Sequence, residues 1–316
     1  MFQSQLRSLR SGRLAALLVA VGTVLVALLP GSTAKGINGG TETTTANNEW
    51  MAAVTSWVEV NISSYEPISH CGGTLIDPQW VLTAAHCVNG TYQTVTLGNE
   101  NPFNSSGGEE HYVVEVVVHP DFDHDCIPPE GQSATIPCIA DIALLKLSEP
   151  STREPLALPG SAARVGESLI VLGWGTSNAD PETGSAVLKQ KTVSVYLDSV
   201  CGLWLRSGKN AFSPSLFRPT ENLVCTGPDG IGARLTSWWL IARRAGSSNV
   251  GSVCPGDSGG PLVRRIPGGN QLAGVEELVG VISLTATCGP RRANFYEAEV
   301  DVFQFKPWIL ETTQED

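Results

Sequence analysis

The sequence predicts an all-β protein that is built from barrels or sandwiches of short strands. Its 33 glycines and 20 prolines among 316 residues give the frequent turns of a strand-rich chain. Between these turns lie apolar or alternating runs of 4–9 residues that are rich in β-branched side chains. Long helical periodicity is missing until the C-terminus. These three observations favour strands over a helix bundle.

Each expected strand is a short apolar run between turn residues. The first ones are expected over residues 73–76, 80–83, 112–118 and 142–147. Further strands are expected over 168–172, 279–283 and 294–302, and a helix is expected over 302–312. The turn-rich segment 148–166 divides the chain into two halves of similar size, without any internal repeat.

The N-terminus has the pattern of a secretory signal peptide. Arg7, Arg10 and Arg13 precede an apolar run of 16 residues, and small residues follow at 31–34. A retained membrane anchor is the alternative, but the run is shorter than the roughly 20 residues that span a bilayer. We therefore expect a signal peptide over residues 1–34, an extracellular protein, and no stable membrane association.

Composition excludes two other classes of protein. A hydrophobic fraction of 42% is too high for a disordered chain. The formal net charge of −11 argues against a nucleic-acid partner, which requires a basic surface.

In a secreted chain, Asn-x-Ser/Thr triplets indicate glycosylation and cysteines indicate disulfides. Three such triplets, at Asn61, Asn89 and Asn104, predict glycosylation in a secreted chain. The eight cysteines predict four disulfides rather than metal ligands, because no C-x-x-C or zinc-type spacing is present. Spacing alone leaves 105 possible pairings open.

Three strings contain the kinds of residue that acyl transfer requires. His86 lies in WVLTAAHC, Asp141 begins DIALLKL, and Ser258 lies in CPGDSGGP. Each string alone fits a core histidine, a turn cap or a turn residue. Together they supply a hydroxyl nucleophile, a base and a carboxylate that orients the base. Glycines around Ser258 would let the N–H groups of Gly256 and Ser258 converge as an oxyanion hole.

These strings, in the order His, Asp, Ser, resemble the chymotrypsin/trypsin-like serine protease family. Smaller matches are GWG at 173–175, LVC at 223–225, the serine at 283 after GVI, and FKPWI at 305–309. The resemblance covers about residues 37–312. It implies two antiparallel six-stranded β-barrels of the chymotrypsin-like kind, over 37–150 and 151–316, with the catalytic residues between them and a short C-terminal helix.

The resemblance also implies a disulfide pattern. It pairs Cys71 with Cys87, Cys201 with Cys225, and Cys254 with Cys288. Cys126 and Cys138 remain, and they would close an insertion that lies just before Asp141.

Activation is expected to depend on the N-terminus of the mature chain. In the family, the α-amine of a new N-terminal isoleucine pairs with the aspartate before the nucleophile, which corresponds to Ile37 and Asp257. Gly36 precedes Ile37, where a basic residue is usual. We therefore expect either a two-residue propeptide, 35–36, that a dipeptidase removes, or signal cleavage directly after Gly36.

The resemblance places the primary specificity pocket at four positions. Ser252 corresponds to the floor, Ser283 lies beside the pocket, and Thr285 and Asn294 correspond to its walls. Because the floor position holds no Asp, a Lys or Arg side chain of the substrate would be buried in this pocket without a counter-charge. This argues against cleavage after basic residues. The larger wall residues favour cleavage after small or medium uncharged residues.

Two stretches depart from the family pattern. Residues 234–249, with Trp238 and Trp239, make the segment before Cys254 unusually long. They are interpreted as an exosite, a tolerated surface insertion, or translated intron sequence, and the last is favoured because two adjacent exposed tryptophans make a poor surface. The acidic stretch 99–110 is either a calcium loop or a solvated loop, and its irregular spacing favours the latter. No other cofactor and no other metal is expected.

The sequence thus predicts a secreted serine endopeptidase that acts on proteins or peptides, with a proteinaceous inhibitor as a further candidate partner. A catalytically idle binding protein on the same fold is the alternative. The altered pocket favours that alternative, whereas the presence of all three chemical groups argues against it.

Overall fold

Strands account for most of the chain, as the turn-rich sequence predicts. The computed structural model describes residues 37, 39–61, 64–102, 107–122, 138–177, 180–198, 222–229, 253–268, 274–284 and 297–314. From Lys35 onward the chain forms a single compact unit.

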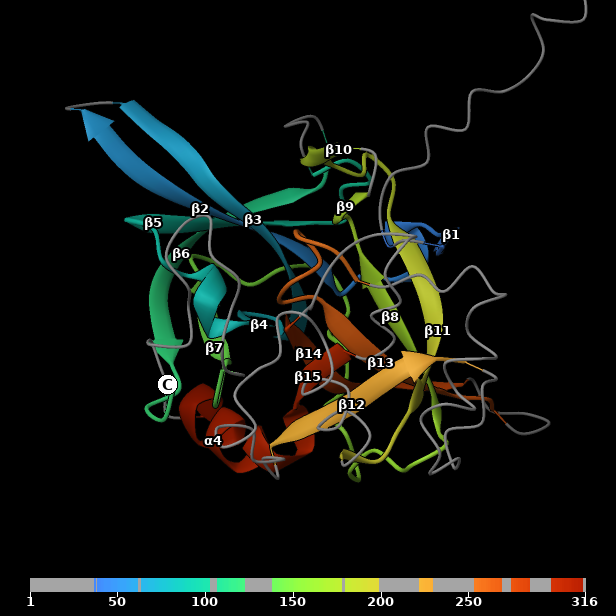
Figure 1. Cartoon of the computed structure of the whole chain (residues 1–316). Coiled ribbons are helices and arrows are strands. Elements are labelled where there is room, and N and C mark those ends of the chain that lie inside the picture. The colour runs from blue at the N-terminus through green and yellow to red at the C-terminus, as the bar shows by residue number, and fades with distance from the viewer. Residues whose placement is uncertain are drawn as a thin grey trace, which may run out of the picture. The chain divides into compact units, whose positions relative to one another are not determined.

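Six antiparallel strands close the first barrel (Figure 1). Around the barrel they are β2 (Met51–Asn61), β3 (Ser64–Asp77), β4 (Trp80–Thr83), β7 (Ala143–Leu147), β6 (Glu109–Val118) and β5 (Tyr92–Leu97). Two short 3-10 helices, η1 (Thr45–Asn47) and η2 (Ala85–Cys87), precede β2 and follow β4.

A second barrel is formed by the C-terminal half. Its strands are β8 (Ser168–Gly173), β11 (Lys189–Val195), β12 (Leu223–Pro228), β15 (Glu297–Asp301), β14 (Val275–Leu284) and β13 (Pro261–Ile266), and the β8–β11 pairing closes it. β1 (Thr41–Glu42) pairs with the outer part of β11, and β9 (Thr176–Ser177) pairs with β10 (Asp180–Gly184). The predicted fold class, two antiparallel six-stranded barrels and a short C-terminal helix, is confirmed.

The expected strands all coincide with observed ones. The last expected strand, 294–302, is observed as Glu297–Asp301, and residues 294–296 lie outside the described residues. The expected C-terminal helix is α4 (Val302–Gln314).

Helix α4 connects the second barrel back to the first. Its Phe305 and Trp308 rings both lie 4.9 Å, edge to face, from the His119 ring, which follows β6 of the first barrel. Such edge-to-face ring contacts add to the area that the helix buries. The helix therefore helps to fix the two barrels against each other, which matters for any site between them.

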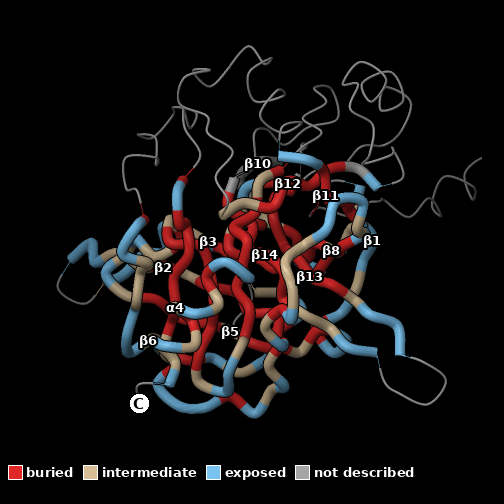
Figure 2. Tube along the Cα trace, turned by 90° about the horizontal axis from the view of Figure 1, so that it is seen from below, coloured by how far each residue is buried: buried red, intermediate tan, exposed pale blue. Residues whose placement is uncertain are grey.

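Buried residues run along the strands of both barrels, whereas exposed ones concentrate in connections and hairpin ends (Figure 2). In the first barrel Leu75, Val81 and Leu144 have no exposed surface. The second barrel buries Leu169 and Val279 in the same way. Burial of such side chains contributes roughly 1.5–3 kcal/mol each, and it produces a rigid frame for the loops between the barrels.

Candidate active site

His86 and Asp141 form the central contact of the candidate site. Nδ1 of His86 lies 2.7 Å from Oδ2 of Asp141, and the backbone N–H of His86 donates to Oδ1 at 2.9 Å. His86 lies in η2, shortly after β4, whereas Asp141 lies two residues before β7, which pairs with β4. The pairing of these two strands therefore brings the two side chains together.

A third hydrogen-bond donor to the Asp141 carboxylate lies in the second barrel. The Ser283 hydroxyl, on β14, donates to Oδ2 of Asp141 at 2.6 Å, and both side chains are buried. The sequence placed Ser283 beside the specificity pocket but gave no sign of this bond, because the two residues are 142 positions apart. This contact crosses from one barrel to the other.

The turn before β7 presents Asp141 in an uncommon backbone conformation. Ala140 has φ of 49°, which residues with a Cβ atom adopt rarely. The N–H of Ile142 donates to the Ala140 carbonyl at 2.7 Å and supports this turn. The strained residue Ala140 therefore directly precedes Asp141, whose buried carboxylate faces His86.

The electrostatics of the pair favour a negative aspartate and a basic histidine. Burial alone would lower the pKa of His86, but the charge and hydrogen bond of Asp141 outweigh it and raise that pKa. Burial would raise the pKa of Asp141, but the contacts of His86 and Ser283 lower it. Asp141 consequently stays ionised at neutral pH and can stabilise an imidazolium.

Ser258 lies on a loop that is hydrogen-bonded to the first barrel. Its carbonyl accepts a hydrogen bond of 2.7 Å from the N–H of Gly72, one residue after Cys71. Within the described residues the Ser258 hydroxyl makes no hydrogen bond to His86. Such contacts are often long in proteins without bound substrate and tighten when substrate binds.

Two backbone N–H groups beside Ser258 have no protein acceptor among the described residues. They belong to Gly256 and Ser258, the two predicted oxyanion donors. Gly256, two residues before the serine, has φ of 92°, a conformation that favours glycine. N–H groups without an acceptor are what a developing oxyanion would require.

Asp257 is fully buried behind this loop. It accepts hydrogen bonds from the N–H of Gly175 at 2.7 Å and from the N–H of Cys254 at 2.8 Å. Burial raises the pKa of Asp257 to about 7, against these two bonds and the charge of Lys189. A Cβ atom on Gly175 would overlap this carboxylate, which explains the glycine there. Ile37 is also fully buried, in a cluster of second-barrel side chains.

The predicted specificity pocket is only partly within the described residues. Ser252, Thr285 and Asn294 lie outside them. A residue that the sequence did not suggest lies next to this region: the Glu297 carboxylate accepts a hydrogen bond of 2.7 Å from the N–H of Val253. Burial raises the pKa of Glu297 to about 7, although Val253 and Lys191 favour its charged form.

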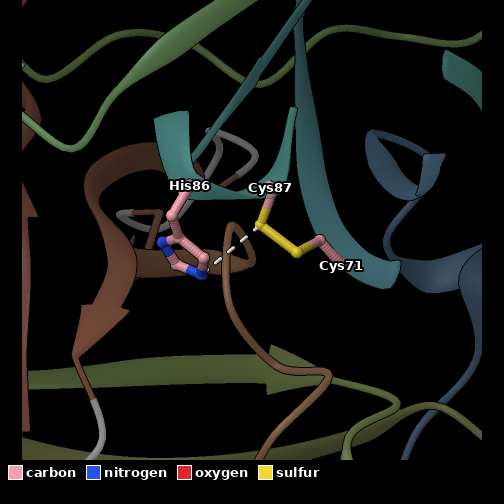
Figure 3. Close-up of side chains that lie close together, drawn as sticks. All are labelled: Cys71, His86 and Cys87. Atoms are coloured by element: carbon pink, nitrogen blue, oxygen red, sulfur yellow. Dashed lines mark hydrogen bonds between the residues drawn. A yellow bond between two sulfur atoms is a disulfide. The ribbon is translucent and has the colours of Figure 1, made fainter. Parts of the chain in front are cut away.

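The predicted Cys71–Cys87 disulfide is present, with Cα atoms 6.1 Å apart. Figure 3 shows this disulfide beside His86, whose Nε2 atom lies 3.7 Å from the Cys87 sulfur. The three residues lie close enough together to resemble a metal site, but thiolates are the metal-binding form of cysteine and the disulfide excludes them. The disulfide instead anchors the helical turn that positions His86.

The remaining cysteines are described in part. Cys138, Cys225 and Cys254 are disulfide-bonded. Their predicted partners Cys126, Cys201 and Cys288 lie outside the described residues, so these three pairings stay predictions.

The predicted glycosylation sites and the acidic stretch are only partly within the described residues. Asn61 and Asn89 are exposed, whereas Asn104 lies outside the described residues, as does the insertion at 234–249. In the acidic stretch, Glu100 accepts hydrogen bonds from the backbone and hydroxyl of Thr45, and Glu109 pairs with Arg153 at 3.1 Å. These protein donors leave fewer carboxylate oxygens for a calcium ion.

The fold and the site together define a class of protein. Two antiparallel barrels meet at a partly exposed imidazole that is paired with a buried carboxylate, and a glycine-rich serine loop lies beside this pair. This is the architecture of a double-barrel hydrolase. Comparison with known proteins then assigns the chain to a family within this class.

The family model described as Trypsin matches residues 37–236 and 243–309. A trypsin from Simulium vittatum is 31% identical over 248 residues, which cover 75% of this chain and 78% of the relative. Chymotrypsin-like elastase family member 1 from Bos taurus is 28% identical, over 78% of this chain and 81% of the relative. The chain belongs to the trypsin family of serine endopeptidases.

A solved structure supports the same assignment. The structure described as "Structure of GrC" matches with a TM-score of 0.58 and 25% sequence identity, over 88% of this chain and 99% of that chain. The family model leaves residues 237–242 unmatched, inside the predicted insertion. Within the described part of the chain, we find no helix whose length and apolar content would let it span a membrane.

Proposed function

We propose that this peptidase is secreted and cleaves peptide bonds through Ser258, His86 and Asp141. The observation that carries the proposal is the pair of partly exposed His86 and buried Asp141, with contacts of 2.7 and 2.9 Å, next to the loop that presents Ser258. Ser258 would attack the peptide carbonyl while His86 takes its proton. His86 would then give that proton to the leaving amine, and water would release the acyl group by the reverse sequence.

Asp141 would act by holding His86 in one tautomer. Its carboxylate accepts from Nδ1, so the other ring nitrogen, Nε2, is left as the base. The Ser283 hydroxyl supports the carboxylate from the opposite side at 2.6 Å. The two free N–H groups of Gly256 and Ser258 would stabilise the negative oxygen of the tetrahedral intermediate.

Cleavage before Ile37 would complete the site. Asp257 is buried with two backbone donors and a raised pKa of about 7, so it lacks a full counter-charge in the uncleaved chain. A new α-ammonium at Ile37 would supply that charge and stabilise the loop around Ser258. Removal of a signal peptide over 1–34 and of residues 35–36, or signal cleavage after Gly36, would generate this N-terminus.

Substrates are proposed to be proteins or peptides with a small or medium uncharged residue before the scissile bond. The absence of Asp at Ser252 and the side chains of Thr285 and Asn294 support this preference. A protein inhibitor that occupies the same cleft is the second proposed partner.

A cleavage profile tests this proposal. The chain beginning at Ile37 is incubated with a peptide library at pH 8, where His86 is the free base, with Ser258→Ala as the control. We expect cleavage after Ala, Val or similar residues, and none with the control. Cleavage confined to Lys or Arg would contradict the specificity, and no cleavage by folded, processed chain would favour the idle binding protein.

A further inference from the structure

The negative charge of this chain is concentrated in its first barrel. Residues 37–150 contain 15 Asp or Glu residues and a single basic residue, Lys146. Residues 151–316, in contrast, contain 16 acidic and 15 basic residues. A surface with charge of one sign attracts segments of the opposite sign over roughly a Debye length, about 8 Å at physiological salt. A partner of the first barrel is therefore expected to be basic.

An outward-facing group of aromatic side chains lies on this barrel. We call it the aromatic face, and it consists of Trp57, Tyr65, Tyr92 and Tyr112. The Trp57 and Tyr92 rings are stacked with centroids 6.0 Å apart, and the Tyr65 ring meets Tyr92 edge-on at 5.0 Å. Tyr65 and Tyr112 are 43% and 65% exposed. The hairpin of β2 and β3 that presents two of these rings extends outward in Figure 1.

A cavity of about 410 Å³ opens on the same face, between β2, β3, β5 and the start of β6. Trp57 lines it, and its indole N–H donates to the Thr94 hydroxyl at 3.0 Å. His70 lines the opposite part, with Nδ1 3.1 Å from the Thr55 hydroxyl. These bonds hold the ring planes in place, so a ligand would meet a preformed surface.

The charges around this cavity are acidic. Glu110 lines the cavity and is exposed, and Glu59 pairs with Tyr65 in register, so it shares the outer side of the hairpin. Burial lowers the pKa of His70, which keeps that ring neutral at physiological pH. No Lys or Arg is among the residues that line the cavity.

The cavity lies within a short reach of the active-site serine. His70 is two residues before Gly72, and the N–H of Gly72 donates to the Ser258 carbonyl at 2.7 Å. Two residues of an extended strand span about 7 Å. A substrate chain that passes Ser258 therefore needs only a few residues to arrive at the aromatic face.

We propose that the aromatic face and its cavity bind a Lys- or Arg-bearing segment of the protein substrate, outside the specificity pocket. The methylene groups of such side chains would lie on the rings of Trp57 and Tyr92. Their cationic ends would face the ring planes and the carboxylates of Glu59 and Glu110. The proposal rests on the proposed protease function only in assigning this segment to a substrate.

Binding is tested apart from hydrolysis. Fluorescence anisotropy measures the Kd of a labelled hexalysine peptide for the Ser258→Ala chain. The double variant Glu59→Gln/Glu110→Gln should raise Kd by roughly two- to thirtyfold, since it removes two surface charge contacts. Tyr112→Ala should also weaken binding, and added salt should weaken it in the parent. A hexaglutamate peptide should not bind.

Glu66→Gln is the matched control. Glu66 lies on the same hairpin but pairs with Val58, and it alternates with the cavity-lining Pro67, so it faces the other side. This variant makes the same charge change and should alter Kd by less than about twofold. Equal Kd values for the double variant, Glu66→Gln and the parent would overturn the proposal.

Kinetics connect the face to the enzyme. With Ser258 intact, a substrate that carries three lysines near the scissile bond should have a higher kcat/KM than its three-serine analogue, and the double variant should remove that advantage. Binding without hydrolysis would sink the proposed function but leave this inference standing. A dimer in sedimentation that Tyr112→Ala abolishes would show that a second copy occupies the face, and would overturn the inference.

Discussion

The substitution Ser283→Ala removes one of three donors that hold the Asp141 carboxylate. The Ser283 hydroxyl donates to Oδ2 at 2.6 Å, where His86 Nδ1 also donates at 2.7 Å, and the His86 backbone donates to Oδ1 at 2.9 Å. Asp141 has no exposed surface. Water therefore cannot simply replace the missing hydroxyl.

The expected loss follows from the charge of the acceptor. A hydrogen bond to a charged group contributes about 1.5–3 kcal/mol, so the free energy of unfolding at pH 7 should fall by that amount. The same loss raises the pKa of Asp141, because the Ser283 hydroxyl stabilises only the ionised carboxylate. Because this pKa is lowered in the folded chain, the contribution is complete above the ordinary value of 3.8 and disappears as pH falls through the lowered value.

Urea unfolding of the Ser258→Ala background at pH 7, 5 and 3 measures this effect. The difference between Ser283→Ala and its parent should be equal at pH 7 and 5 and smaller at pH 3. Ser194→Ala is a matched control, because its hydroxyl donates to the exposed Asp229 at 2.7 Å far from the site; we expect a loss below about 1 kcal/mol. A loss under about 0.5 kcal/mol at pH 7, or one that grows on acidification, would refute the reasoning.

Three further predictions concern the buried acids and the N-terminus. Gly175→Ala places a methyl group against the Asp257 carboxylate, so thermal unfolding should show a loss of about 1–3 kcal/mol or more; an unchanged melting temperature would contradict the packing. Glu299 is fully buried, with one oxygen bonded to Thr226 at 2.7 Å, and burial and the neighbouring Glu297 charge raise its pKa. Stability is therefore lost as pH rises above about 4.5, and Glu299→Gln should raise the melting temperature more at pH 8 than at pH 5; a uniform shift would argue against this charge effect. N-terminal sequencing of active protein should give Ile37, and activity in chains that retain Lys35 or Gly36 would contradict the activation proposal.

Local patterns in the sequence predicted the strands and the residues that meet at the site. Short apolar runs between turns mark each strand, since a strand needs only its own alternation to be recognised. The strings around His86 and Asp141 picked out two residues whose side chains are in contact, because β4 and β7 are neighbours in the barrel. The disulfide of Cys71 with Cys87 followed from the family resemblance rather than from spacing.

Other features depend on contacts that no local pattern encodes. Ser283 donates to a carboxylate in the other barrel, and nothing in its neighbourhood distinguishes it from an ordinary strand serine. In β15, Glu297, Glu299 and Asp301 alternate as solvent-facing residues would, yet all three are buried. Glu297 and Glu299 accept hydrogen bonds from Val253 and Thr226, which only the closed barrel brings near.

Covalent labelling of Ser258 tests the central claim most directly. The chain beginning at Ile37 is treated with a serine-directed phosphonate, and the adduct is located by intact mass and peptide mapping. We expect one adduct per chain, on Ser258, that is absent in Ser258→Ala and forms far more slowly in Asp141→Asn, because His86 is then held in the wrong tautomer. Folded and correctly processed chain that takes up no label, or takes it up at another serine, would contradict the account.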